Sequence, residues 1–140
     1  MNTGIFYMSR TGNTKLFAQA IADQTKAPLY DITATQPSET QKFDLLFLGT
    51  PVEGSSPTKE ITAFIDVMST ASGKKAILFV TYKIFGNNHS MKVMEKRLKE
   101  KGIETVLMVS KKGLKPEKPA DFSDALAEIQ KVIEKMSITD

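Results

Sequence analysis

The residues best suited to bind a ligand form one polar segment near the N-terminus, made of Ser9, Arg10, Thr11, Gly12, Asn13 and Thr14. We call this segment the N-terminal loop. It lies between an apolar run and a helical pattern, so its amides are expected in the first turn of a helix, where N–H groups lack partners and the helix dipole attracts anions. Gly12 would let the backbone approach an anion closely. Hydroxyl and amide side chains add donors, which predicts a site for a phosphate monoester held without a lysine clamp.

The same segment could instead be a polar turn in which Thr11 or Asn13 only caps a helix. It is neither a Walker A loop nor a Gly-x-Gly-x-x-Gly dinucleotide motif, because it has neither the Gly-Lys-Ser/Thr nor the paired glycines of those motifs. It follows the first predicted strand directly, and hydroxyl or amide side chains occupy four of its six positions. We therefore favour the phosphate site.

Short apolar runs predict the strands that position this loop. Several are apolar at successive positions, as in strands covered by helices on both faces. The expected strands are Ile5–Met8, Pro28–Ile32, Phe43–Leu48, Ala76–Val80 and Val106–Val109.

Apolar residues at helical spacing predict the helices that cover the sheet. Ser56 and Pro57 are expected as the N-cap and first residue of the second helix, and Gly102 as the end of the third. The connection Thr33–Lys42 has room for a short helix at most. The apolar stripes are Leu16, Phe17, Ala20 and Ile21; Ile61, Phe64, Ile65 and Met68; Met91, Met94 and Leu98; and Phe122 to Met136.

This alternation predicts an α/β fold. We expect a doubly wound three-layer α/β/α sandwich with a mainly parallel sheet, as one domain over residues 1–140. Such sheets bind ligands beyond the carboxyl ends of their strands, where the strand order reverses. The function is therefore expected after Met8, Gly49 and Val80.

Composition excludes several kinds of chemistry. The chain has 140 residues, no cysteine and one histidine, so thiolate chemistry and multi-histidine metal centres are excluded. We expect no metal site and no catalytic side chains, with the chemistry belonging to a bound small molecule. The net charge of +3 is spread over several segments, which does not favour a nucleic-acid partner. Since we find neither a signal-peptide pattern nor an apolar run of membrane-spanning length, we expect a cytoplasmic protein without membrane contact.

The N-terminal loop, together with Met8, resembles the Ser/Thr-x-Thr-Gly-x-Thr phosphate loop of the flavodoxin family. The resemblance extends over nearly the whole chain and is to the short-chain members. It implies a five-stranded parallel sheet of order 2-1-3-4-5, with FMN bound at the switch between the first and third strands. It also implies a role in electron or hydride transfer.

The resemblance further implies that two more loops hold the flavin ring. After the third strand, Val52 would pack on the isoalloxazine and Thr50 would bond the ribityl chain or ring edge. The peptide between Glu53 and Gly54 could reorient to meet the protonated N5 of a reduced flavin. An ordinary strand-to-helix loop is the alternative. The residues implied here are Thr50, Pro51, Val52, Glu53 and Gly54.

After the fourth strand, the resemblance implies an aromatic ring stacked on the flavin. Phe85 is the first choice and Tyr82 the second, although either could be a core residue. The residues implied here are Tyr82, Lys83, Ile84, Phe85, Gly86 and Asn87.

The sequence departs from the flavodoxin pattern in its charge. The chain has no tryptophan, and Lys83 stands in a loop where acidic residues are common. A lysine near the ring would stabilise an anionic reduced flavin and raise its potential. Electron-transfer flavodoxins are usually acidic, so the net charge of +3 suggests an acidic or neutral redox partner, or a small redox substrate.

Four functions fit these observations to different degrees. We expect an FMN-binding electron carrier, as a monomer or weak homodimer. The alternatives are an FMN-dependent NAD(P)H or quinone oxidoreductase and an interaction module that has lost its flavin. A receiver-like signalling domain would need a phosphorylatable acidic residue after the third strand, where Gly49, Thr50 and Pro51 stand instead.

Overall fold

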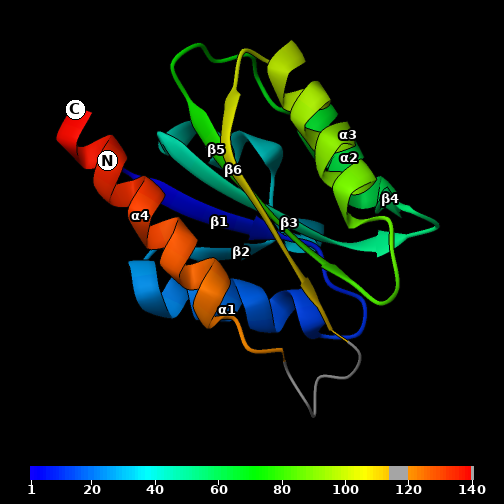
Figure 1. Ribbon diagram of the computed structural model, residues 1–140. Coiled ribbons are helices and arrows are strands. Elements are labelled where there is room, and N and C mark those ends of the chain that lie inside the picture. The colour runs from blue at the N-terminus through cyan, green and yellow to red at the C-terminus, as the bar shows by residue number, and fades with distance from the viewer. Residues whose placement is uncertain (114–119, 140) are drawn as a thin grey trace.

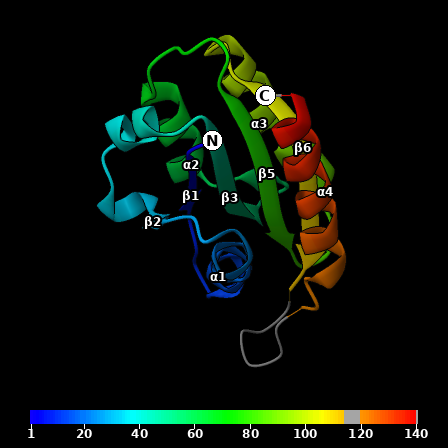
Figure 2. The same cartoon turned by 90° about the vertical axis from the view of Figure 1, so that its left-hand side faces the viewer.

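A central sheet with helices on both faces forms the molecule (Figures 1 and 2). The computed structural model describes residues 1–113 and 120–139. The strands are β1 (Thr3–Tyr7), β2 (Leu29–Asp31), β3 (Leu45–Glu53), β4 (Ser56–Pro57), β5 (Lys75–Tyr82) and β6 (Glu104–Lys112). Five strands pair in parallel in the order β2-β1-β3-β5-β6, and β4 pairs antiparallel with the end of β3.

The helices divide between the two faces of the sheet, with α1 and α4 on one face and α2 and α3 on the other (Figure 1). Their bounds are α1 (Asn13–Thr25), α2 (Lys59–Val67), α3 (Asn87–Glu100) and α4 (Ser123–Thr139). Two short 3-10 helices, Ile32–Ala34 and Pro37–Lys42, connect β2 to β3. The connection expected to hold a short helix at most therefore has two short 3-10 helices, of three and six residues.

Consecutive residues of the central strands point into opposite cores, which explains their unbroken apolar runs. Ile5 of β1 belongs to the core beneath α1 and α4, and Phe6 to the core beneath α2 and α3. In β3, Leu45 likewise points into the core beneath α1 and α4, and Leu46 into the core beneath α2 and α3. These two leucines, like the two residues of β1, are fully buried. The predicted fold class and the order of the five parallel strands are confirmed.

The prediction that Ser56 and Pro57 begin the second helix is wrong. These residues form β4, and α2 begins at Lys59 with Thr58 as its N-cap. The chain folds back because Gly54 and Ser55 both have positive φ, 56° and 67°, as in the two-residue turn of a β-hairpin. The third strand consequently continues through Glu53 rather than ending at Leu48. Gly102, with φ of 80°, follows the end of α3 as expected.

The N-cap of α2 gives a test of this local structure. The Thr58 hydroxyl accepts a hydrogen bond from the Ile61 amide at 3.3 Å and is bonded to the Thr50 hydroxyl at 3.1 Å. Replacing Thr58 with alanine is expected to lower the free energy of unfolding by about 1–2 kcal/mol, measured by urea denaturation, because a helix cap and a buried hydrogen bond are lost. Thr58→Ser keeps the hydroxyl and should lose less than half as much; equal losses would show that the hydroxyl does not matter.

No helix in the described ranges combines the length and the apolar character needed to cross a membrane.

Candidate functional site

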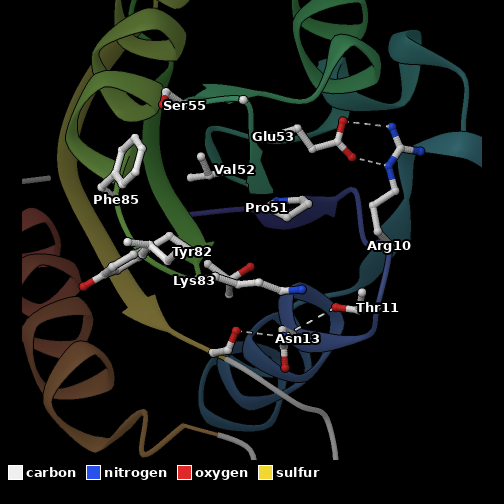
Figure 3. A pocket seen from close by; sticks show the side chains of 14 residues that line it. Arg10, Thr11, Asn13, Pro51, Val52, Glu53, Ser55, Tyr82, Lys83 and Phe85 are labelled. Carbon is white, nitrogen blue, oxygen red and sulfur yellow. Dashed lines mark hydrogen bonds and ion pairs between the residues drawn. The ribbon is translucent and has the colours of Figure 1, made fainter.

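A cavity of about 410 Å³ opens where the carboxyl ends of the central strands meet the following loops. This volume lies in the range of about 300–1,000 Å³ typical of small-molecule sites. Figure 3 shows the cavity between the N-terminal loop, the β3–β4 hairpin and the loop after β5. Its lining residues are Arg10, Thr11, Asn13, Pro51, Val52, Glu53, Gly54, Ser55, Thr81, Tyr82, Lys83, Ile84, Phe85 and Gly113.

The backbone of the N-terminal loop offers a row of unpaired donors. Gly12 is the N-cap of α1 with φ of 104°, a conformation that side chains strongly disfavour. Within the described residues, the amides of residues 10–14 have no protein acceptor, and the next amide, Lys15, bonds the Ser9 hydroxyl at 3.3 Å. The first turn of α1 carries no acidic side chain, so its dipole is not neutralised locally. The geometry suits a bound anion.

Two polar side chains of the N-terminal loop form hydrogen bonds to residues at the ends of β5 and β6. Asn13 is buried and donates to the Gly113 carbonyl, directly after β6, at 3.0 Å. The Thr14 hydroxyl, also buried, lies 2.7 Å from the hydroxyl of Thr81 in β5. These contacts fix the loop against the ends of β5 and β6. The O–H groups of Ser9 and Thr11 act only as acceptors in the described structure, so both remain able to donate.

Arg10 points away from the amides of residues 10–14, which we call the cradle of amides, and toward the carboxylate of Glu53 (Figure 3). It donates to Glu53 from Nε at 2.5 Å and from Nη2 at 3.3 Å, and it reaches both carboxylate oxygens of Glu60 at 2.7 and 2.9 Å. Hydrogen bonding to both partners raises the pKa of Arg10, and the bond from Arg10 lowers the pKa of Glu60. The guanidinium thus joins the N-terminal loop to the hairpin and to the first turn of α2.

The β3–β4 hairpin packs against the start of α3. A Cβ added to Gly86 would lie 2.7 Å from Cα of Ser55 and 2.9 Å from a methyl of Val52, so a glycine is required for this close approach. Ser90 also donates to the Ser55 carbonyl at 3.4 Å. Since Arg10 holds Glu53 on the other side, the hairpin is fixed at two points.

The loop after β5 supplies the opposite, mostly apolar wall. Ile84 is 78% exposed and Phe85 66% exposed at the mouth of the cavity. Figure 3 shows Phe85 and Tyr82 on the side facing away from Arg10, with Lys83 reaching across between them and the N-terminal loop. Unlike Arg10, Lys83 has no hydrogen-bond or ion-pair partner within residues 1–113 and 120–139.

The three predicted loops come together at this cavity, but their residues occupy two kinds of position. Eleven of the seventeen predicted residues line it. Thr50 and Thr14 lie behind the lining, each fully or almost fully buried and bonded to another threonine, and Asn87 bonds Ser110 at 2.9 Å. The other predicted residues outside the lining are Ser9, Gly12 and Gly86.

Three lining residues were not predicted: Ser55, Thr81 and Gly113. Ser55 is the second residue of the hairpin turn, which the prediction of a helix start at Ser56 obscured. Gly113 follows the last strand, and the rule that ligands bind beyond strand ends could have found it.

Comparison with known proteins identifies a family for almost the whole chain. Residues 4–135 match the family model of the flavodoxin domain. An uncharacterized protein of Methanocaldococcus jannaschii is 32% identical over 93 residues, which are 66% of this chain and 61% of that protein. The chain therefore matches less than two thirds of that relative's length.

Solved structures agree on the fold. A flavodoxin of Streptococcus pneumoniae TIGR4 superposes with a TM-score of 0.78 at 16% identity, over 100% of both chains. Oxidised flavodoxin 1 of Bacillus cereus gives a TM-score of 0.71 at 21% identity, over 83% of this chain and 86% of that one. A flavoprotein of Lactobacillus acidophilus NCFM in complex with FMN gives 0.61 at 19% identity, over 78% and 92%.

Proposed function

This chain belongs to the flavodoxin family, a family of FMN-binding proteins, and on that premise we propose that it carries electrons on FMN between redox partners. The observation that carries the proposal is the row of unpaired amides at the start of α1, which opens into a cavity large enough for a small cofactor. FMN, when bound, supplies chemistry of one or two electrons, and the protein supplies binding and orientation.

The residues fit the two ends of FMN. The amides of residues 10–14 and the hydroxyls of Ser9 and Thr11 would hold the phosphate. The flat ring would lie between the hairpin, with Val52, and the loop after β5, with Phe85 or Tyr82. A cavity with polar donors at one end and aromatic and aliphatic walls at the other is what this amphipathic ligand requires.

The peptide between Glu53 and Gly54 is proposed to contact the ring edge. Gly54 has φ of 56° and a Cβ built on it would meet nothing within 4 Å, so this peptide has space to change orientation. The neighbouring Ser55 and the Glu53 side chain are held in place, which confines any reorientation to that one peptide.

The net charge of the chain indicates which kind of redox partner would bind it. With a net charge of +3 and two exposed apolar side chains at the mouth of the cavity, we propose that the partner docks over Ile84 and Phe85 and is acidic or neutral. The rate of electron transfer to an acidic partner should then fall as salt concentration rises.

The test is the visible spectrum of the purified protein, followed by its denaturation. A yellow protein that releases FMN, or an apoprotein that becomes yellow and non-fluorescent on adding FMN, is the expected result. A colourless protein that does not respond to FMN would overturn the proposal. Sustained oxidation of NAD(P)H by the isolated holoprotein would instead identify an oxidoreductase, while an electron carrier should show none without a partner.

A further inference from the structure

Among the residues that the structure describes, two cationic side chains line the cavity, Arg10 and Lys83, and their surroundings differ. Arg10 belongs to the N-terminal loop itself, yet both edges of its guanidinium are occupied by the carboxylates of Glu53 and Glu60. Two carboxylates against one guanidinium give this cluster a net charge of −1. Four of its five N–H groups are used in this way, so Arg10 has no edge left that could bind a ligand through two hydrogen bonds unless one of these pairs breaks.

Lys83 is the opposite case. It comes from the loop after β5, on the far wall of the cavity, and it is exposed and without a protein partner in the described ranges. In Figure 3 its side chain extends across the cavity and its ammonium group lies toward Thr11 and the first turn of α1. The ammonium group of Lys83 thus points toward the cradle of amides, although Lys83 is 72 positions from Thr11 in the sequence.

Resting on the proposed function, we propose that Lys83 is the residue that binds the phosphate of FMN by charge, and that Arg10 acts as a positioning residue that offsets half of the negative charge of Glu53 and Glu60. A phosphate monoester carries about −2 at neutral pH. Neutral amides and hydroxyls bind it but leave its charge uncompensated, and an ammonium ion supplies charge-assisted hydrogen bonds. Without Arg10, two carboxylates near the cradle would repel the phosphate.

This division of roles makes the site selective for phosphorylated flavin. Riboflavin has the same ring and ribityl chain as FMN but no phosphate, so a contact to the phosphate changes FMN affinity alone. A lysine that acted on the ring would change the affinities of both flavins together. The ratio of the dissociation constants for FMN and riboflavin therefore shows whether Lys83 contacts the phosphate or the ring.

The first test titrates apoprotein with FMN and with riboflavin and follows the quenching of flavin fluorescence. We expect Lys83→Gln to weaken FMN binding about fivefold to tenfold, as for a partly exposed charge-assisted bond, and to change riboflavin binding less than about twofold. Lys92→Gln is the matched control, because Lys92 is an exposed lysine of α3 outside the cavity. It should change neither constant by more than about twofold. Equal changes for both flavins, or no change, would overturn the assignment of Lys83.

The second test separates the indirect role of Arg10 from direct contact. Arg10→Gln should weaken FMN binding about fivefold, since two exposed carboxylates lose their counter-ion. Adding Glu53→Gln and Glu60→Gln to this variant should restore FMN binding to within about twofold of wild type, because the carboxylates that repel the phosphate are gone. A triple variant that binds FMN as weakly as Arg10→Gln does would make Arg10 a direct ligand and overturn its role as a positioning residue. Thermal unfolding of each variant establishes that it is folded before titration.

The titrations distinguish a failure of the proposed function from a failure of the role assigned to Lys83. If wild-type apoprotein binds neither flavin, the proposed function fails. If it binds both flavins and Lys83→Gln leaves their ratio unchanged, only the present inference fails.

Discussion

Replacing Gly12 with alanine is expected to weaken FMN binding about 30- to 100-fold while riboflavin binding stays within about threefold of wild type. Gly12 has φ of 104°, beyond the region in which an L-residue is stable, so an alanine would relax toward negative φ. That rotation would turn the amides of residues 11–13 away from the phosphate. Loss of one or two charge-assisted bonds, at about 1.5–3 kcal/mol each, accounts for the change. Fluorescence titration with both flavins measures it.

The control for Gly12 is a glycine with the same backbone constraint elsewhere. Gly73 has φ of 86° in a turn where an added Cβ would meet nothing within 4 Å, and it lies outside the cavity. Gly73→Ala should lower the melting temperature through the same kind of strain and leave the affinity for FMN unchanged. If Gly12→Ala binds FMN as wild type does, the N-terminal loop is not the phosphate site.

Replacing Gly49 with alanine is expected to destabilise the whole domain by about 3 kcal/mol or more. Gly49 lies in β3 between Tyr7 of β1 and Phe79 of β5. A Cβ at this position would lie 2.1 Å from the ring of Phe79, which is fully buried and packs against Phe17 at a ring distance of 5.3 Å. Because the core cannot move aside, overpacking costs at least the usual 1–3 kcal/mol. Thermal unfolding should show a midpoint lowered by roughly 10 °C.

A second substitution shows whether the Phe79 ring is the cause. Phe79→Leu shortens the side chain that an alanine at Gly49 would strike. The double variant should therefore be less destabilised than the sum of the two single variants, by about 1 kcal/mol or more. Strict additivity would mean that the close approach of Gly49 to Phe79 does not determine the packing here.

The fold could be predicted because the sequence patterns that indicate its strands and helices are formed by residues close together in the chain. Strands covered on both faces produce unbroken apolar runs such as Leu45–Leu48, which are legible without tertiary information. The N-terminal loop could be recognised for the same reason, since a strand, a polar turn with Gly12 and a helix are consecutive in sequence. The end of α3 at Gly102 follows the same logic.

The start of α2 could not be placed because three residues compete for it. Ser56 and Thr58 are both good N-cap residues, and Pro57 suits a first helical position or an edge strand. The backbone of Gly54 and Ser55 determines where α2 begins. Their two positive φ angles form a hairpin turn, so that the next residues pair with β3 as a strand and the helix starts after them. A positive φ at a serine is rare enough that composition alone did not indicate it.

The charge pattern of the site also depends on tertiary contacts. Arg10 pairs with Glu53 and Glu60, which are 43 and 50 positions away. From sequence, Arg10 is a cation in a phosphate loop and Lys83 a cation in a ring loop. The structure pairs the first with carboxylates and leaves the second unpartnered in the described ranges, facing the cradle of amides.

A ¹H–¹⁵N titration of labelled apoprotein with FMN tests whether the backbone amides of residues 10–14 hold the phosphate. The amides of residues 10–14 are expected to move most, and downfield, since each gains an anionic acceptor. With riboflavin, the amides of the hairpin and of the loop after β5 should shift while those of residues 10–14 stay nearly in place. Shifts by FMN that leave residues 10–14 unmoved would contradict the claim that these amides hold the phosphate.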